Sequence, residues 1–427
     1  MNMITVILIM LCGFTFATDK NAKSLDELIS IGLKRNHSVS IAELQFKQTQ
    51  AWEKASFSGF LPSVSMGVSK SLNEETVAYI EGVPFQSPTA SARLNISETI
   101  FDGARSWYSH QSAMNQIHSS QINLKSKNEM VIQSVKSSYY AYLASLELHE
   151  VAILSLELAE SQLQLVSQQY ELQAVSETDL LKAKVRKGQA ESQVIQSVQS
   201  KQSTLNNIRI AIGYSVWEPL DIIKGDVTLN ELIEFEDAKQ KVRNGNSQLE
   251  IARIQLEGSS IEWKTQVGVF FPTVYVAASY VASDTEFFDS VTGLVDVKPS
   301  TSLNLSIPIF SKMNNKARLD QLKYGILTAK ANKLQLEDQL MKELDDLLIT
   351  LKTYHQLIPI NEEIILSAEM DSNLAQEKYN LGANDILDLL NAQVSLIQAK
   401  SELVRLKYSA KIAEAQLETI LGTSYKL

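Results

Sequence analysis

The sequence predicts a mainly α-helical chain that also carries four membrane-crossing β-strands. Three observations lead to this fold class: the chain repeats itself, four short segments alternate apolar and polar residues, and two stretches of about 70 residues contain one proline between them. Four strands cannot close a barrel, and open sheet edges are not tolerated in lipid. We therefore expect a trimer with a 12-stranded barrel that is continued by a long α-helical barrel.

Composition narrows the class of protein further. The chain has 427 residues, 44% of them hydrophobic, and a net charge of −10. Its mean hydropathy of −0.07 argues against a helical membrane protein. The acidic balance argues against nucleic acid as a partner, because phosphate binding needs a basic surface. A single cysteine, Cys12, excludes a disulfide framework.

The first residues are typical of an export signal. The stretch from Met3 to Phe16 is nearly all apolar, and Ala17 completes a small-residue cleavage pattern. The alternative is a buried N-terminal segment, which the cleavage pattern disfavours. A signal peptide at 1–17 predicts export to a periplasm, an outer membrane or the outside.

The chain contains an internal sequence repeat, with its two copies offset by about 209 residues. Leu94–Ser97 matches Leu303–Ser306, and Tyr170 matches Tyr379. Another match, between Ser24–Ile29 and Thr228–Ile233, has an offset of 204. The predicted parts are a signal peptide (1–17), an N-terminal helix (18–59), a first β-hairpin (60–101), a first helical hairpin (102–213), a linker (214–227), the helix of the second repeat (228–270), a second β-hairpin (271–310) and a second helical hairpin with the C-terminal end (311–427).

The strand segments alternate with a period of two residues, which indicates one buried or lipid-facing side and one polar side. The apolar positions are Val64, Met66, Val68, Leu94, Ile96, Ile100, Val274, Val276, Ala278, Tyr280, Leu303, Leu305, Ile307 and Ile309. Glu98 falls on the apolar side. Four phenylalanines at the same end of the strands predict an interfacial aromatic girdle: Phe60, Phe101, Phe271 and Phe310. Long polar loops are expected over 72–90 and 283–299.

Each half predicts one very long helix and two shorter helices. The stretch from Gly103 to Glu171 lacks proline and would be about 104 Å long as a helix. The shorter helices, 24–58 and 177–212, together match that length. The second half repeats this plan with 312–380, where Pro359 should introduce a kink, and 384–421. Apolar residues at heptad spacing predict a coiled-coil-like end of the first long helix: Val151, Leu154, Leu158, Leu165 and Leu172.

No pattern in the sequence indicates an enzyme. The five histidines have no metal-ligand spacing, and neither a phosphate-binding loop nor a nucleophile elbow is present. No catalytic residue, metal or cofactor is therefore predicted. A small basic cluster lies just after the first helical turn, at Lys182, Lys184, Arg186 and Lys187. An exposed helix face explains it slightly better than contact with a partner.

This plan resembles the outer membrane efflux protein family, the TolC-like proteins. The resemblance rests on the double repeat, the strand start Leu61–Val64, the strand-to-helix passage Leu94–Gly103, and the stretch Tyr379–Ala392. It implies a homotrimer in the cell outer membrane that extends into the periplasm. It also implies a periplasmic adaptor (membrane fusion protein) and an inner-membrane pump of the RND, ABC or MFS class as partners, with the trimer as the exit duct.

The resemblance also assigns site residues. Adaptor docking is expected at the two helical turns, Leu172-Gln173-Ala174 and Leu381-Gly382-Ala383. The pore constriction is expected near Tyr379 and Asp388, with Asp179 at the equivalent place in the first half. Asp385 lies three residues before Asp388, on the same helix face, and could substitute for the aspartate that is missing at Asn391. Two departures stand out, because Gln173 replaces the usual glycine and Asn391 replaces an aspartate of the constriction. The alternative role for Asp385 and Asp388 is to stabilise a helix start.

Two other functions fit parts of the pattern. A passive outer membrane porin would need more strands per chain and fewer helices. A periplasmic coiled-coil adaptor or structural protein would lack paired ten-residue strands with an aromatic girdle. The cargo does not follow from the sequence, because a duct carries whatever its pump delivers.

Overall fold

The computed structural model describes residues 22–70, 77–80, 83–86, 90–225, 227–284 and 296–423. The predicted signal peptide and Cys12 lie outside the described residues. The chain divides into two compact units, each built from three separate stretches. Of the described residues, the first unit holds those up to 39 together with 130–234 and 346–419, and the second unit holds 40–129, 235–345 and those from 420.

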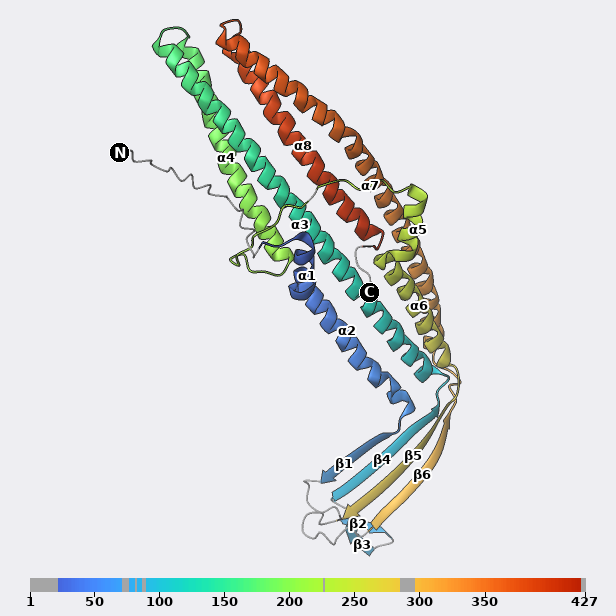
Figure 1. The fold of residues 1–427 in the computed structure, drawn as a ribbon. Helices are drawn as coiled ribbons and strands as arrows, with labels where there is room; N and C mark the ends of the chain where they lie inside the picture. Colours follow the sequence, from blue (N-terminus) through green and yellow to red (C-terminus); the bar gives the residue numbers. More distant parts are fainter. Residues whose placement is uncertain are drawn as a thin grey trace, which may run out of the picture. The chain divides into compact units, whose positions relative to one another are not determined.

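The second unit contains a four-stranded antiparallel sheet (Figure 1). Its strands are β1 (Ser63–Lys70), β4 (Ala90–Phe101), β5 (Thr273–Asp284) and β6 (Asp296–Ser306), in the order β1-β4-β5-β6. The two predicted hairpins are therefore neighbours in one sheet, and β1 and β6 form its edges. A second sheet of two short strands, β2 (Val77–Ile80) and β3 (Val83–Gln86), lies where we expected only a loop.

The strand register confirms that the sheet has one apolar and one polar face. Met66 pairs with Leu94, which pairs with Tyr280. On the other face serines pair across strands, with hydroxyl oxygens 2.8 Å apart between Ser63 and Ser97. The same contact measures 2.9 Å between Ser69 and Ser91 and between Ser279 and Ser300. The apolar face is exposed within the chain, as a lipid-facing surface must be.

The ends of β5 and β6 differ from the prediction. Both strands extend into the segment expected as a loop, and β6 ends at Ser306, before Ile307 and Ile309. Pairing with β5 continues as far as Asp296 and includes Pro299, which pairs with Tyr280. A proline is tolerated there because β6 is an edge strand of the sheet within one chain.

The two short helical segments that precede the strands are each broken at an asparagine. The first consists of α1 (Leu25–Arg35) and α2 (His37–Ser56), and the second of α5 (Phe235–Gly245) and α6 (Ser247–Gly268). A 3₁₀ turn, η1 (Phe57–Phe60), follows α2. Asn36 and Asn246 both have extended backbone conformations, and each side chain accepts a hydrogen bond from the start of the next helix. The prediction of single helices was therefore wrong.

These asparagines also fix the ends of two returning helices. The Asn36 side chain donates to the carbonyl oxygen of Ala211 at 2.8 Å, in α4 (Glu177–Ala211). The Asn246 side chain donates to the carbonyl oxygen of Ile420 at 3.0 Å, in α8 (Ile386–Ile420). Gly213 and Gly422 follow in left-handed conformations, where a Cβ would collide with backbone. Both halves of the chain thus use the same junction.

The junctions correct the register of the repeat at its start. Asn36 and Asn246 are 210 residues apart, so α1 corresponds to α5 and the match between Ser24–Ile29 and Thr228–Ile233 is wrong. Residues 228–234 are irregular rather than helical. These residues extend the linker as far as the start of α5, so the linker runs over 214–234. The physical reason is that side chains of α8 bind this last part of the linker, as described below.

The long helices have the predicted extent. α3 (Arg105–Glu171) and α7 (Asn314–Asn380) each have 67 residues, and α7 continues through Pro359. The heptad prediction for α3 is wrong in detail, because the fully buried seam consists mainly of small and polar residues. They are Ala152, Ser155, Ala159, Gln162 and Val166. Among the described residues, no helix combines the length and apolar character needed to cross a membrane.

Candidate functional site

The turns between the paired helices have the same backbone geometry despite different sequences. The N–H of Ala174 donates to the carbonyl of Gln169, and the N–H of Ala383 donates to that of Lys378, both at 2.8–2.9 Å. This is the glycine-type helix end, in which the residue before the alanine has a positive φ. Gln173 adopts φ 59° and Gly382 adopts φ 70°. The missing glycine therefore changes the strain of the first turn but not its shape.

The predicted acidic residues lie at the starts of the two following helices. Ser176 caps α4 and forms a capping box with Asp179, whose carboxylate accepts from the Ser176 hydroxyl at 2.7 Å. That hydrogen bond is the main reason that the pKa of Asp179 is lowered. In the second turn Asp385 takes the place of Ser176, and its carboxylate accepts weakly from the N–H of Leu387 at 3.4 Å. Asp388 then corresponds to Asp179.

Tyr379 is buried, in contrast to the acidic residues around it. It belongs to a core at the ends of α3, α4, α7 and α8. The core residues are Val166, Ala183, Ala375, Tyr379, Ile386, Leu389, Leu390 and Ala392. Its hydroxyl donates to the side-chain oxygen of Gln169 at 2.8 Å, which ties α7 to α3. Burial raises the pKa of Tyr379, and the nearby Asp179 and Asp385 raise it further. The structure thus brings these three predicted residues together.

Asp385 and Asp388 are exposed in the single chain. Asp388 lines an open 330 Å³ cavity between α7 and α8, together with Asp371, Lys378 and Asn391. Asn391 lies one turn further along α8, on the same face as Asp388. Leu172 and Leu381, which the sequence predicts as docking residues, are among the most exposed apolar side chains of the described residues, at 79% and 83%.

The predicted girdle residues lie where the strands meet the helices. Phe60 ends η1, Phe101 ends β4, Phe271 precedes β5 and Phe310 follows β6. Because the strands alternate in direction, these positions share one end of the sheet. The exposed fraction of the four side chains ranges from 44% for Phe60 to 76% for Phe310.

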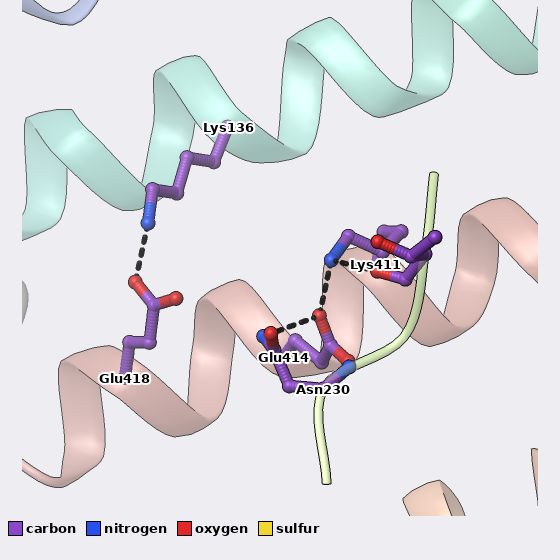
Figure 2. A network of polar contacts seen from close by, with 6 residues as sticks. Lys136, Asn230, Lys411, Glu414 and Glu418 are labelled. Carbon is purple, nitrogen blue, oxygen red and sulfur yellow. Dashed lines mark hydrogen bonds and ion pairs between the residues drawn. The ribbon is translucent and has the colours of Figure 1, made fainter. Parts of the chain in front are cut away.

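A polar network that the sequence did not reveal binds the linker in the first unit. Figure 2 shows Lys411 and Glu414 of α8 facing Asn230 of the linker. The Glu414 carboxylate accepts from the backbone N–H of Asn230 at 2.7 Å and from its side chain at 3.1 Å. Lys411 donates to Glu414 at 2.5 Å and to the carbonyl oxygen of Thr228 at 3.0 Å. Both side chains are 9% exposed, so the pair is buried.

Further contacts bind the earlier part of the linker to the same helices. The Tyr139 hydroxyl donates to the carbonyl of Ile223 and accepts from the N–H of Gly225. Glu147 of α3 accepts from the Tyr408 hydroxyl and pairs with Lys224 at 2.7 Å. Burial, and then the bond to Glu147, raise the pKa of Tyr408. The linker is therefore attached along most of its described length.

Comparison with known proteins identifies the class. The family described as outer membrane efflux protein matches residues 28–214 and again 238–423. The two matches confirm the internal repeat, and together they cover most of the chain. The chain belongs to the outer membrane efflux protein family, whose members are transport channels, and its place is the outer membrane.

Individual relatives agree with this assignment. A probable efflux pump outer membrane protein from Pseudomonas putida, TtgC, is 21% identical over 93% of this chain and 83% of its own length. The cation efflux system protein CusC from Escherichia coli is 26% identical, but that match spans 37% of this chain and 34% of CusC. The structure of the CmeC outer membrane channel from Campylobacter jejuni superposes with a TM-score of 0.83 at 16% identity, covering 94% of this chain and 86% of CmeC.

Proposed function

We propose that three copies of this chain form the exit duct of a tripartite efflux pump or a type I secretion system. The observation that carries the proposal is the sheet β1-β4-β5-β6, which has one exposed apolar face and, within the described part of the chain, two unpaired edges. Edges in lipid leave backbone groups without hydrogen bonds, so β1 of one copy pairs with β6 of the next. Three copies supply twelve strands.

The test of assembly is the mass of the purified protein in detergent, followed by conductance in planar bilayers. We expect a trimer that migrates faster in an unheated gel than its mass predicts and that forms discrete channels. A protein that is only monomeric in detergent and does not conduct would refute the duct.

We also propose that the two helical turns bind a periplasmic adaptor. In support of this, both turns expose a leucine, Leu172 or Leu381, and they share one backbone geometry. A Cβ added at Gly382 meets nothing within 4 Å, so a large side chain there would project outward. Gly382→Trp should abolish export without lowering the yield of trimer. Gly382→Gln is the matched control, because the first turn already carries glutamine in the same conformation. Normal drug resistance or secretion with Gly382→Trp would exclude docking at this turn.

For the constriction, we propose that Asp385 and Asp388 form two stacked rings of carboxylates around the three-fold axis. Such rings favour cations over anions. The competing role, helix capping, is separable because asparagine also caps helices but carries no charge. Asp385→Asn with Asp388→Asn should reduce cation selectivity and block by multivalent cations while stability is preserved. Unchanged selectivity and block would leave capping as their only role.

A further inference from the structure

A cavity of 920 Å³ lies in the first unit between α3, α4 and α8. We call it the α4 cavity. Its wall combines aliphatic side chains with serine, glutamine and arginine, and includes Leu148, Ser155, Arg186, Gln193, Ile397 and Arg405. Cavities of this size hold drug-sized ligands, and binding sites combine apolar surface with polar groups that fix the orientation of the ligand. In the α4 cavity the polar and charged residues outnumber the apolar ones.

Arg186 is the distinctive charged residue of the α4 cavity. It is half-buried, and its only polar contact with the described residues is the Ser155 hydroxyl at 3.5 Å. A guanidinium carries five N–H donors, so most of them point to no acceptor. Burial without a counter-charge also lowers the pKa of Arg186. A cation in this position is stabilised by an anion that enters the cavity.

Its basic neighbours differ in this respect. Lys182 pairs with Asp179 at 3.5 Å, and Lys187 pairs with Glu160 at 3.5 Å and Glu191 at 3.1 Å. These pairs explain part of the basic cluster as an ordinary solvated helix face, as the sequence suggested. They do not explain Arg186.

The remaining charges of the cavity wall leave it positive. Arg405 and Glu402 of α8 pair loosely at 3.8 Å, with their side chains 63% and 51% exposed. They offset each other, so the charge of Arg186 is left uncompensated. An anion is therefore attracted, because Glu402, the one carboxylate among the lining residues, is paired with Arg405 and has no ion pair with Arg186.

The position of the cavity on α8 relates it to the proposed constriction. Ser395 lines both the α4 cavity and the small cavity that contains Asp388 and Asn391. Residues 388, 391 and 395 are spaced by three and four, so they form one stripe along the helix. If Asp388 faces the duct, as we proposed, Ser395 in the wall of the α4 cavity lies on the same face of α8.

We propose that the α4 cavity binds an amphipathic carboxylate that travels through the duct. Its carboxylate pairs with the guanidinium of Arg186, and its apolar part contacts Leu148 and Ile397. That the ligand travels through the duct rests on the proposed function. That the α4 cavity binds a carboxylate at Arg186 does not depend on it.

The experiment uses the full-length protein in lipid nanodiscs and two matched probes, 4-fluorobenzoate and 4-fluorobenzamide, followed by fluorine NMR. We expect the benzoate to bind more tightly than the amide by about tenfold or more, because a hydrogen bond to a charged group is the strong contact here. Arg186→Gln should weaken binding of the benzoate by the same factor and leave the amide unchanged. Lys184→Gln, a change in the same cluster at an exposed position, is the control and should alter neither.

Equal binding of both probes, or unchanged benzoate binding in Arg186→Gln, would overturn the proposal. If Arg186→Gln fails to assemble, Arg186→Lys keeps the charge but loses the planar fork, and it should still weaken the benzoate selectively. Binding of neither probe would also overturn the proposal, since it would mean that the cavity is not accessible to an anion in the assembled protein. Bilayer conductance distinguishes failure of the carboxylate site from failure of the duct. A trimer that conducts but does not bind the benzoate refutes only the site. A protein that binds the benzoate but does not conduct refutes only the duct.

Discussion

Replacing Glu414 with alanine should release the linker from α8. The substitution removes three acceptor contacts, two to Asn230 and one to Lys411. It also leaves the buried ammonium of Lys411 without its counter-charge. Removing one partner of a buried ion pair costs about 3–5 kcal/mol. Lys411 keeps the carbonyl of Thr228 and lies 5.6 Å from the centre of the Tyr140 ring, so we expect the lower end, about 3 kcal/mol.

Hydrogen exchange measured by mass spectrometry tests this estimate on the assembled protein. A loss of about 3 kcal/mol corresponds to local opening that is more frequent by roughly 150-fold, since 1.36 kcal/mol is a factor of ten. The peptide covering residues 227–234 should therefore exchange much faster in Glu414→Ala. Protection in α3 near Tyr139 should change less, because its contacts are with a different part of the linker.

The matched control is Glu418→Ala, one turn further along α8. Glu418 pairs with Lys136 (Figure 2), and these side chains are 35% and 20% exposed, against 9% for both members of the buried pair. Because this pair is only partly buried, its loss should cost less than that of the buried pair and lie closer to the about 0–1 kcal/mol of a surface pair. The double substitution Lys411→Met with Glu414→Leu should restore only part of the protection, because it removes the uncompensated charge but also the acceptors of Asn230 and the donor to Thr228. Equal exchange at 227–234 in the wild type and in Glu414→Ala would refute the reasoning.

Three other outcomes are expected. Gln173→Gly should raise the melting temperature, because Gln173 has a left-handed conformation, which costs a non-glycine residue about 1 kcal/mol. A lower melting temperature in calorimetry would show that Gln173 is not strained. Tyr379→Phe removes the bond to Gln169, worth about 1 kcal/mol, and should increase single-channel conductance. Burial raises the pKa of Glu129, so the folded state holds a proton longer than the unfolded chain does. The stability of the wild type should therefore fall as pH rises from about 4 through that raised pKa, and Glu129→Gln should lack this fall in thermal unfolding.

The sheet could be predicted closely because the membrane imposes a simple rule on it. An apolar face toward lipid and a polar face away from it require strict alternation, and Val64, Met66 and Val68 obey it. The strand ends were less certain, because backbone pairing with β5 extended β6 through Lys298 and Pro299, which have low strand propensity. Pairing between strands outweighs the preference of a single residue.

The helix breaks at Asn36 and Asn246 were missed although the sequence contained a signal. Asparagine is a preferred residue at helix starts, and here it recurs at the offset of the repeat. A search for capping residues at matching positions would have found both junctions. The linker network offered no such signal. Lys411 and Glu414 are an ordinary charged pair on a helix, and Asn230, the partner of Glu414, lies 184 residues before it in the chain.

For the turns, shape was predictable and side-chain roles were not. The resemblance placed Tyr379 in the constriction together with Asp179 and Asp385, and the structure does gather these residues. It also buries Tyr379 in a core, which only the packing of four helices could determine. The unpaired charge of Arg186 likewise depends on which neighbours α3 and α8 present.

The asparagine junctions bear on how this chain arose. Each half carries its own broken helix, two strands of the four-stranded sheet, a long helix and a returning helix, and each closes on itself through the same asparagine and the same left-handed glycine. Such a half is a repeating unit, and duplication and fusion of one ancestral unit would account for both halves. Six unfused blocks around an axis would supply the same twelve strands as three fused chains. In the fused chain the two copies differ, since one turn has glycine and a buried tyrosine whereas the other has glutamine and an exposed tyrosine.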